Sequence, residues 1–197
     1  MNKKKDEIAP ALLLGSASPR RSKILRALGV RFDVEISGVE EVTYDDDPGR
    51  TVRENALQKN AACRSSFPDR CILTADTIVV FNGKCIEKPE SLNQAFVFLR
   101  MLSGQVHKVL TGVVFSEPGL PAEAEVVVSL VRFKDLTEDE MALYFDVVDP
   151  MDKAGAYDVD QYGHMVIESL EGSRTNVMGL PRESVERWLR QHPEFLA

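Results

Sequence analysis

Arg20 and Arg21 stand together at the start of an amphipathic segment, where they can bind an anion. Before them, the apolar run Leu12–Leu14 ends in Gly15, and small residues lead to Ser18 and a proline. Serine is a favourable N-cap and proline suits the first helical position, so the pattern predicts a strand, a short turn and a helix. Free N–H groups and the dipole at a helix N-terminus attract anions, whereas two guanidiniums there repel the dipole. A phosphate between them would remove that conflict, so the segment predicts a polyanion site.

Three candidate carboxylates follow predicted strands. Asp76 comes directly after the apolar strand predicted over Cys71–Ala75, at the carboxyl end where open α/β sheets bind ligands and metals. An aspartate at that place can equally cap a turn. Glu40 and Glu41 lie in an acidic loop over 38–48. Paired carboxylates can hold Mg²⁺ or Mn²⁺, which take oxygen ligands and share them with substrate phosphates, but a solvated acidic loop has the same composition.

Two lysines could complete a phosphate site. Lys59 falls in the helix predicted over Thr51–Arg64, and Lys88 immediately precedes a proline that holds it in an extended conformation. Either lysine alone is typical of an ordinary surface residue. They are candidates for a phosphate site only because Arg20 and Arg21 are also present. The three histidines have no metal-ligand spacing, and nothing in the sequence supports a Ser–His–Asp triad.

Composition limits the classes of function. The chain has 197 residues, of which 44% are hydrophobic and 28% charged, so we expect one domain over 1–197, with 1–10 as a flexible charged tail. No apolar run reaches the roughly 20 residues of a membrane span, and three cysteines without a CxxC pair favour reduced thiols in the cytoplasm. A net charge of −7 argues against nucleic acid as a partner, so a polyanion must be bound by a local basic cluster, a divalent metal or both.

Strands and helices alternate along the chain, which predicts an α/β fold with a mixed sheet. Asn82-Gly83 between two apolar runs is a strong hairpin signal, and Thr137 with Glu140 forms a capping box. Besides those already given, the predicted strands cover Phe32–Ile36, Ile78–Phe81, Cys85–Ile86, Val106–Phe115, Ala124–Phe133 and Met165–Leu170. The further predicted helices reach from Ser91 to Leu102, from Thr137 to about Val148, and from Pro181 to Arg190.

Eight blocks of this sequence, in order and spacing, resemble the Maf family of nucleoside triphosphate pyrophosphatases. They are GSASPRRSKILRALG, GVEE, ENALQKNAA, LTADTIVV, EKP, LSGQVHKVLTGV, DKAGAY and NVMGLP. Any one block is weakly specific, but eight in register are highly specific, and the resemblance covers roughly residues 11–190.

The resemblance implies an elongated α/β fold related to the inosine triphosphate pyrophosphatases (Ham1). It has a mixed twisted sheet flanked by helices, two lobes around a central cleft, and commonly a homodimer. It implies hydrolysis of a nucleotide to the monophosphate and pyrophosphate with a divalent metal, Mg²⁺ or Mn²⁺. By motif, Asp76 matches the carboxylate that activates water, and Glu40 the acidic residue of the metal and water network. Phosphate and cleft contacts are implied for Ser16, Arg20, Arg21, Lys59 and Lys88.

An ordinary aspartate is ionised near neutrality and is a weak general base. We therefore expect Asp76 to act mainly by holding metal and orienting water.

One departure concerns the base of the nucleotide. The thymidine and uridine triphosphate branch of the family usually has Gln three residues after the AGAY tyrosine, and Asp160 stands there, with Gln161 one place later. Arg20 and Thr77 fit that branch. A carboxylate only accepts hydrogen bonds, so Asp160 would favour GTP, 7-methyl-GTP or CTP, whereas a one-residue shift would bring Gln161 into the role. A pyrimidine triphosphate is the favoured expectation.

Two other classes stay open at this point. A non-catalytic nucleotide sensor or cell-division regulator would keep the basic residues without a working carboxylate pair. A nucleotidyltransferase also begins with a strand, a small-residue loop and an arginine, but it usually needs a longer glycine-rich opening and an acceptor domain. The presence of both Glu40 and Asp76 favours the pyrophosphatase.

Overall fold

A mixed β-sheet lies at the centre of the molecule. The computed structural model describes residues 11–197, so the tail expected at 1–10 lies outside the described residues. Within them, seven strands form one sheet in the order β2-β1-β3-β5-β6-β7, with β4 beside β3. β1 is parallel to β2 and to β3, and the other pairs are antiparallel. The strands are β1 (Leu12–Leu14), β2 (Phe32–Val34), β3 (Ile72–Phe81), β4 (Lys84–Ile86), β5 (Val106–Ser116), β6 (Glu123–Phe133) and β7 (Ile167–Glu171).

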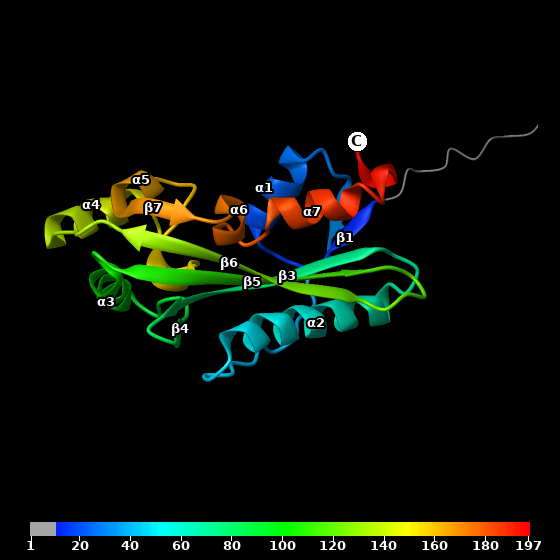
Figure 1. The fold of residues 1–197 in the computed structure, drawn as a ribbon, viewed down its shortest axis with the longest axis horizontal. Helices are drawn as coiled ribbons and strands as arrows, with labels where there is room; N and C mark the ends of the chain where they lie inside the picture. The colour runs from blue at the N-terminus through cyan, green and yellow to red at the C-terminus, as the bar shows by residue number, and fades with distance from the viewer. Residues whose placement is uncertain (1–10) are drawn as a thin grey trace, which may run out of the picture.

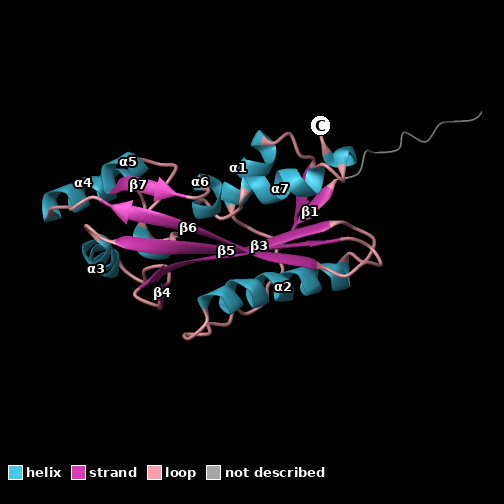
Figure 2. Cartoon of the chain, viewed as in Figure 1, coloured by secondary structure: helices cyan, strands magenta, loops and turns pink. Residues whose placement is uncertain are grey.

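Helices cover both faces of this sheet, as Figures 1 and 2 show: α2 lies on one face, and α1, α6 and α7 on the other. The alternation of side chains in β1 produces this layering, because Leu12 and Leu14 pack against α1 and α7 while Leu13 packs beside Cys63 of α2. The helices are α1 (Pro19–Ala27), α2 (Pro48–Ser66), α3 (Leu92–Leu102), α4 (Glu138–Val147), η1 (Ala154–Ala156), α5 (Gly163–Val166), α6 (Arg174–Val177), α7 (Arg182–Leu189) and η2 (Pro193–Phe195).

The core divides into two main clusters, one in each lobe. The first joins β1, α1 and α7, and the second joins the far halves of β5 and β6 to α3 and α4. β3 and β5 contribute to both clusters, so the lobes share the sheet. The predicted α/β class, with a mixed sheet flanked by helices, is confirmed.

β3 differs from its prediction. The polar pair Asp76 and Thr77 predicted the end of a strand, but β3 continues through them, and Asp76 pairs with Gly112 of β5. Both polar side chains have partners on neighbouring elements: the carboxylate contacts α2, and the hydroxyl lies 3.0 Å from that of Thr111. Because these groups are satisfied, the strand need not end. Asp76 therefore lies in the middle of a strand, and its predicted place at a strand's end is wrong.

Local signals are confirmed where side chains act on their own turn. Ser18 caps α1, Ser91 caps α3, and the Thr137–Glu140 capping box opens α4. Asn82 and the glycine after it have positive φ, as the predicted two-residue hairpin requires. The short helices α5 and α6 were not predicted. Among the described residues, no helix combines the length and apolar character needed to cross a membrane, and the three cysteines are free thiols.

Candidate active site

A cleft of about 460 Å³ lies between the two lobes and contains most of the predicted site residues. It is bounded by the turn after β1, the loop before α2, the middle of β3, the segment from Asp152 to Val159, and the α6 region. A cleft of this size falls in the range of small-molecule sites, which are about 300–1,000 Å³.

The cleft lies where one edge of β3 has no neighbouring strand. β1 ends at Leu14, and the Gly15 N–H donates the last bond of that ladder to the Leu73 carbonyl at 2.8 Å. β4 pairs with β3 only from Val79 onward. Between these two partners, one edge of β3 is free of strands, and Asp76 and Thr77 lie there. The site is therefore beside the carboxyl end of a parallel strand, as expected for a sheet of this class, but the strand is β1.

Asp76 is buried, with 5% of its surface exposed, and is held by two side chains of α2. Lys59 Nζ donates to Oδ1 at 2.7 Å, and Asn55 Nδ2 donates to Oδ2 at 3.1 Å. Lys59 also donates to Glu41 Oε1 at 2.5 Å, so its ammonium bridges two carboxylates. A buried ammonium needs such partners, because an unpaired buried charge is strongly destabilising. Asp76, Lys59 and Glu41 form a fixed chain of charges at the foot of the cleft.

The structure places Glu41, and not Glu40, at this chain. Both glutamates are exposed, but Glu40 does not line the cleft, whereas Glu41 lines it and contacts Lys59. The loop is held by Asn55, whose side chain accepts from the Val42 N–H at 2.8 Å and donates to the Val42 carbonyl at 3.0 Å. Asn55 thus fixes both the loop and Asp76, a role that no sequence motif signalled.

Arg21 is clamped by groups from three segments. Its guanidinium donates to the Gly179 carbonyl at 2.8 Å, to Ser16 Oγ at 2.8 Å and to Thr77 Oγ1 at 3.2 Å. Burial lowers the pKa of Arg21, and the charges of Asp76 and Glu41 oppose that shift. Arginine stays charged in proteins, so this clamp holds a fixed positive charge near the two carboxylates.

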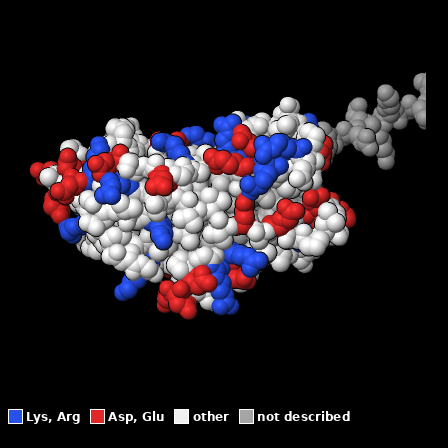
Figure 3. All heavy atoms as spheres, in the orientation of Figure 1, with Lys and Arg blue, Asp and Glu red and all other residues white. Residues whose placement is uncertain are grey.

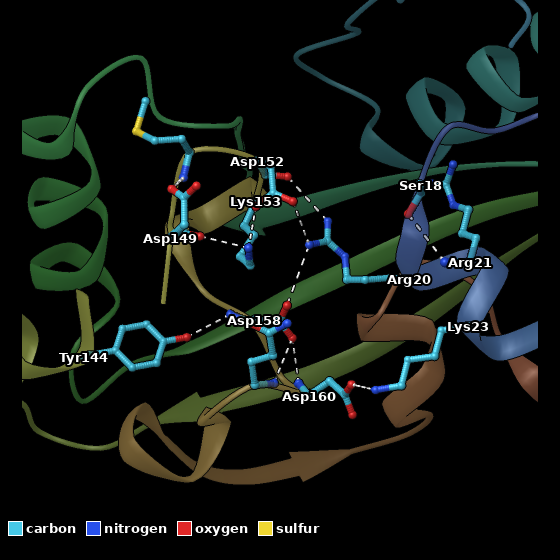
Figure 4. A network of polar contacts seen from close by, with 12 residues as sticks. Ser18, Arg20, Arg21, Lys23, Tyr144, Asp149, Asp152, Lys153, Asp158 and Asp160 are labelled. Carbon is cyan, nitrogen blue, oxygen red and sulfur yellow. Dashed lines mark hydrogen bonds and ion pairs between the residues drawn. The ribbon is translucent and has the colours of Figure 1, made fainter. Parts of the chain in front are cut away.

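Arg20 instead reaches the opposite wall of the cleft, as Figure 4 shows. Its guanidinium lies 3.4 Å from Asp152 Oδ2 and 3.7 Å from Asp158 Oδ2. Lys153 bonds the Asp152 carboxylate and donates to the Asp149 carbonyl at 2.8 Å. Burial acts to raise the pKa of Asp152, but the hydrogen bond and charge of Lys153, with Arg20, bring it below its usual value.

Of the remaining predicted residues, one lines the cleft and two do not. Lys88 lines the cleft and is exposed. Asp160 and Gln161 do not line it: the Asp160 carboxylate pairs with Lys23 of α1 (Figure 4), and Gln161 is exposed. The carboxylate of this turn that does line the cleft is Asp158, two residues earlier.

On the face shown in Figure 3, acidic and basic side chains are interspersed, and no broad basic field is seen there. Arg20, Arg21, Lys59 and Lys88 nevertheless converge on one cleft of an acidic protein, where carboxylates also line the walls, so the cleft gathers cationic groups that the visible surface does not. A local cluster of this kind is what binding of a polyanion requires when the overall charge opposes it.

The donor set fits a hard divalent cation. Asp76 and Glu41 offer carboxylate oxygens, and magnesium is usually held by one or two carboxylates together with substrate phosphates and waters. Over residues 11–197, no group of three or more His, Cys, Asp or Glu side chains is placed to hold a metal ion. Such an ion would therefore take its other ligands from a bound polyanion and from water.

An α/β sheet with a cleft that brings paired carboxylates and clamped guanidiniums together is typical of proteins that bind a polyanion. A family model described as Maf-like protein matches residues 11–192, and the chain belongs to the Maf family.

Its curated relatives include a dTTP/UTP pyrophosphatase of Neisseria meningitidis serogroup A, 42% identical over 86% of this chain and 88% of the relative. Another dTTP/UTP pyrophosphatase, of Syntrophus aciditrophicus, is 40% identical over 91% of this chain and 88% of the relative. A solved structure of the Staphylococcus aureus Ham1 protein matches 92% of this chain and 99% of its own, at 14% identity and a TM-score of 0.49.

Proposed function

We propose that this protein hydrolyses a nucleoside triphosphate to the monophosphate and pyrophosphate, with dTTP and UTP as its substrates. The observation that carries the proposal is the chain of charges Asp76–Lys59–Glu41, in which Asp76 and Lys59 are buried and which lines the same cleft as the clamped guanidinium of Arg21. Membership of the Maf family supports the reaction, and relatives named dTTP/UTP pyrophosphatase support the choice of base.

The cationic side binds the triphosphate. Ser16 lies in the turn after β1 and Arg21 in the first turn of α1, where the free N–H groups of the helix N-terminus also favour an anion. Lys88 lines the cleft from the segment that follows β4. Fixed positive charges stabilise the negative charge that develops on departing pyrophosphate, and they need no reorganisation during the reaction. These residues therefore both position the substrate and stabilise the leaving group.

The carboxylate side orients the attacking water. Asp76 is held by Asn55 and Lys59 in one orientation, and Glu41 lies on the other side of the same ammonium. We assign Asp76 and Glu41 as the carboxylates that would hold Mg²⁺ or Mn²⁺, which would supply charge stabilisation and an activated water when bound. Lys59 keeps the two carboxylates close together by balancing their charges.

The proposal includes the setting in which the enzyme acts. We propose a single Maf domain that works in the cytoplasm as a homodimer and removes surplus or non-standard nucleotides from the pool. The acidic overall charge and the free thiols support a small-molecule substrate and a reducing compartment.

A nucleotide panel tests the proposal. We expect pyrophosphate release from dTTP and UTP with Mg²⁺ or Mn²⁺, and none after a chelator is added. Asp76→Asn removes the charge on Asp76 and should lower turnover by about a hundredfold or more, while circular dichroism confirms that the variant is folded. Unchanged turnover in Asp76→Asn would remove Asp76 from the mechanism, and nucleotide binding without hydrolysis would indicate a sensor.

A further inference from the structure

The wall of the cleft opposite the α1 N-terminus contains a buried carboxylate whose role is not explained by triphosphate chemistry. Asp158 is 5% exposed and lines the cleft. It lies on the segment after η1, away from Asp76, Lys59 and Glu41, which belong to the α2 side of the sheet. A buried carboxylate that faces a ligand cleft is a strong candidate for substrate recognition, because burial makes its hydrogen-bonding requirement strict.

The two oxygens of Asp158 have different surroundings. Oδ1 accepts the N–H groups of Asp160 at 2.7 Å and Gln161 at 3.2 Å, which fixes the turn and the orientation of the carboxylate. The Asp158 N–H in turn donates to the Tyr144 hydroxyl at 2.9 Å. Oδ2 has only the guanidinium of Arg20 nearby, at 3.7 Å, which exceeds a hydrogen bond. One oxygen is therefore committed to the backbone, and the other retains its capacity to accept.

The cleft also has apolar walls, which suit a nucleobase. They are formed by Val79, Val109, Val159, Val177 and Met178. If the triphosphate lies by Ser16, Arg21 and Lys59, the base must lie along the remaining wall, where a few polar groups among apolar ones set specificity.

We propose that Asp158 is a specificity-determining residue that accepts the N3–H of uracil or thymine, while Arg20 donates to the adjacent carbonyl oxygen of the same base. This inference rests on the proposed function and deepens it. A single free carboxylate oxygen beside a guanidinium matches one N–H beside one C=O. Uracil and thymine have this edge, and guanine has it with a further NH₂ donor; the relatives named dTTP/UTP pyrophosphatase favour the pyrimidine. Cytosine has an acceptor at N3, so its ring nitrogen would face the carboxylate with no hydrogen between them.

The substitution Asp158→Asn reverses this pattern and preserves the turn. Only the amide oxygen can accept the two backbone N–H groups, so the amide NH₂ faces the cleft as a donor. We expect kcat/KM for CTP relative to UTP to rise by about tenfold or more, the effect of one hydrogen bond to a charged group. The matched control is Asp160→Asn, the same change two residues away on a side chain that pairs with Lys23 outside the cleft. It should keep the wild-type base preference.

A substrate analogue tests the same contact in the unaltered enzyme. 3-Methyl-UTP lacks the N3–H, and wild-type protein should hydrolyse it with a kcat/KM about tenfold or more below that of UTP. In Asp158→Asn this penalty should shrink, because the amide NH₂ does not accept the N3–H of UTP in the first place. Equal use of UTP and 3-methyl-UTP by wild-type protein would overturn the inference even if the variant does not fold, as would an unchanged CTP to UTP ratio in a folded variant. If the wild-type protein released pyrophosphate from none of the nucleotides tested, that result would instead overturn the proposed function.

Discussion

At the scale of single residues, the chemistry of the cleft depends on the ammonium of Lys59. It is 9% exposed and contacts Asp76 and Glu41 at once. Without it, the two carboxylates would repel each other at the foot of a cleft that also has to accept phosphates. With it, the two carboxylates are held close together around one ammonium, so their oxygens are already in place before a cation or a phosphate enters the cleft.

Two adjacent glutamates offer a matched test of this arrangement. Glu41→Gln removes a charge that contacts Lys59, and we expect kcat/KM for the preferred nucleotide to fall by about tenfold to a hundredfold, the worth of a charged hydrogen bond. Glu40→Gln changes an exposed side chain outside the cleft and should leave kcat/KM unchanged. Steady-state pyrophosphate release measures both. A larger fall in kcat/KM for Glu40→Gln than for Glu41→Gln would instead indicate that Glu40 is the catalytic glutamate.

Residue types were predictable from the sequence, but positions one or two residues apart were not. The GVEE block assigns Glu40 to the metal network, but Glu41 is the glutamate that lines the cleft, because an irregular loop has no periodicity that fixes which side chain points inward. Asp158 and Asp160 lie on a turn that is held by a hydrogen bond from the Asp160 N–H to the Asp158 carboxylate. The sequence pattern does not show which of these two side chains faces the cleft. Asn55 gave no signal, because a polar residue on a helix is normally assigned to solvent.

At the scale of elements, the height of α2 above the sheet decides whether Asn55 and Lys59 reach Asp76. Gly112 of β5 pairs with Asp76 and lies directly under this helix. A Cβ at Gly112 would lie 2.3 Å from the Val52 carbonyl oxygen, which is backbone and cannot turn aside. The absence of a side chain at Gly112 is therefore what permits the helix to approach the carboxylate.

Gly112→Ala should lift α2 from the sheet. We expect a loss of about 1–3 kcal/mol in the free energy of unfolding, typical of overpacking, and a fall in kcat/KM of up to about a hundredfold from misplaced catalytic groups. Gly49→Ala is the control in the first turn of the same helix, where the nearest atom to the new Cβ is a side-chain oxygen at 3.4 Å. Urea unfolding and turnover measure both, and wild-type behaviour of Gly112→Ala would contradict the packing argument.

Elements defined by local chemistry were predicted better than those defined by distant contacts. The caps of α1, α3 and α4 and the hairpin at Asn82 depend on residues a few positions apart, and the structure confirms them. The continuity of β3 depends on partners in α1, α2 and β5, which the local sequence does not reveal. The prediction therefore ends the strand at Ala75, before Asp76. α5 and α6, with four residues each, are too short to show helical periodicity.

At the scale of the whole molecule, the cleft lies between two cores that share the long strands β3 and β5. The segment that forms its far wall is anchored in the second core through His107 of β5. His107 is 1% exposed, its Nε2 lies 2.9 Å from the Tyr157 hydroxyl, and its ring packs edge-on against Phe133. A titratable group inside this core makes the stability of the molecule depend on pH.

Burial lowers the pKa of His107 to about 4, from an ordinary value of 6.5. As the pH falls below 6.5, the unfolded chain gains a proton that the folded protein does not, so this residue lowers stability progressively until about pH 4. The loss between pH 7 and about pH 4.5 should be about 2 kcal/mol. In His107→Gln, the drop in unfolding free energy over that range should shrink by this amount, whereas His164→Gln, at an exposed histidine, should leave it unchanged. Urea titrations at the two pH values measure the difference, and identical drops in wild type and His107→Gln would show that His107 does not contribute.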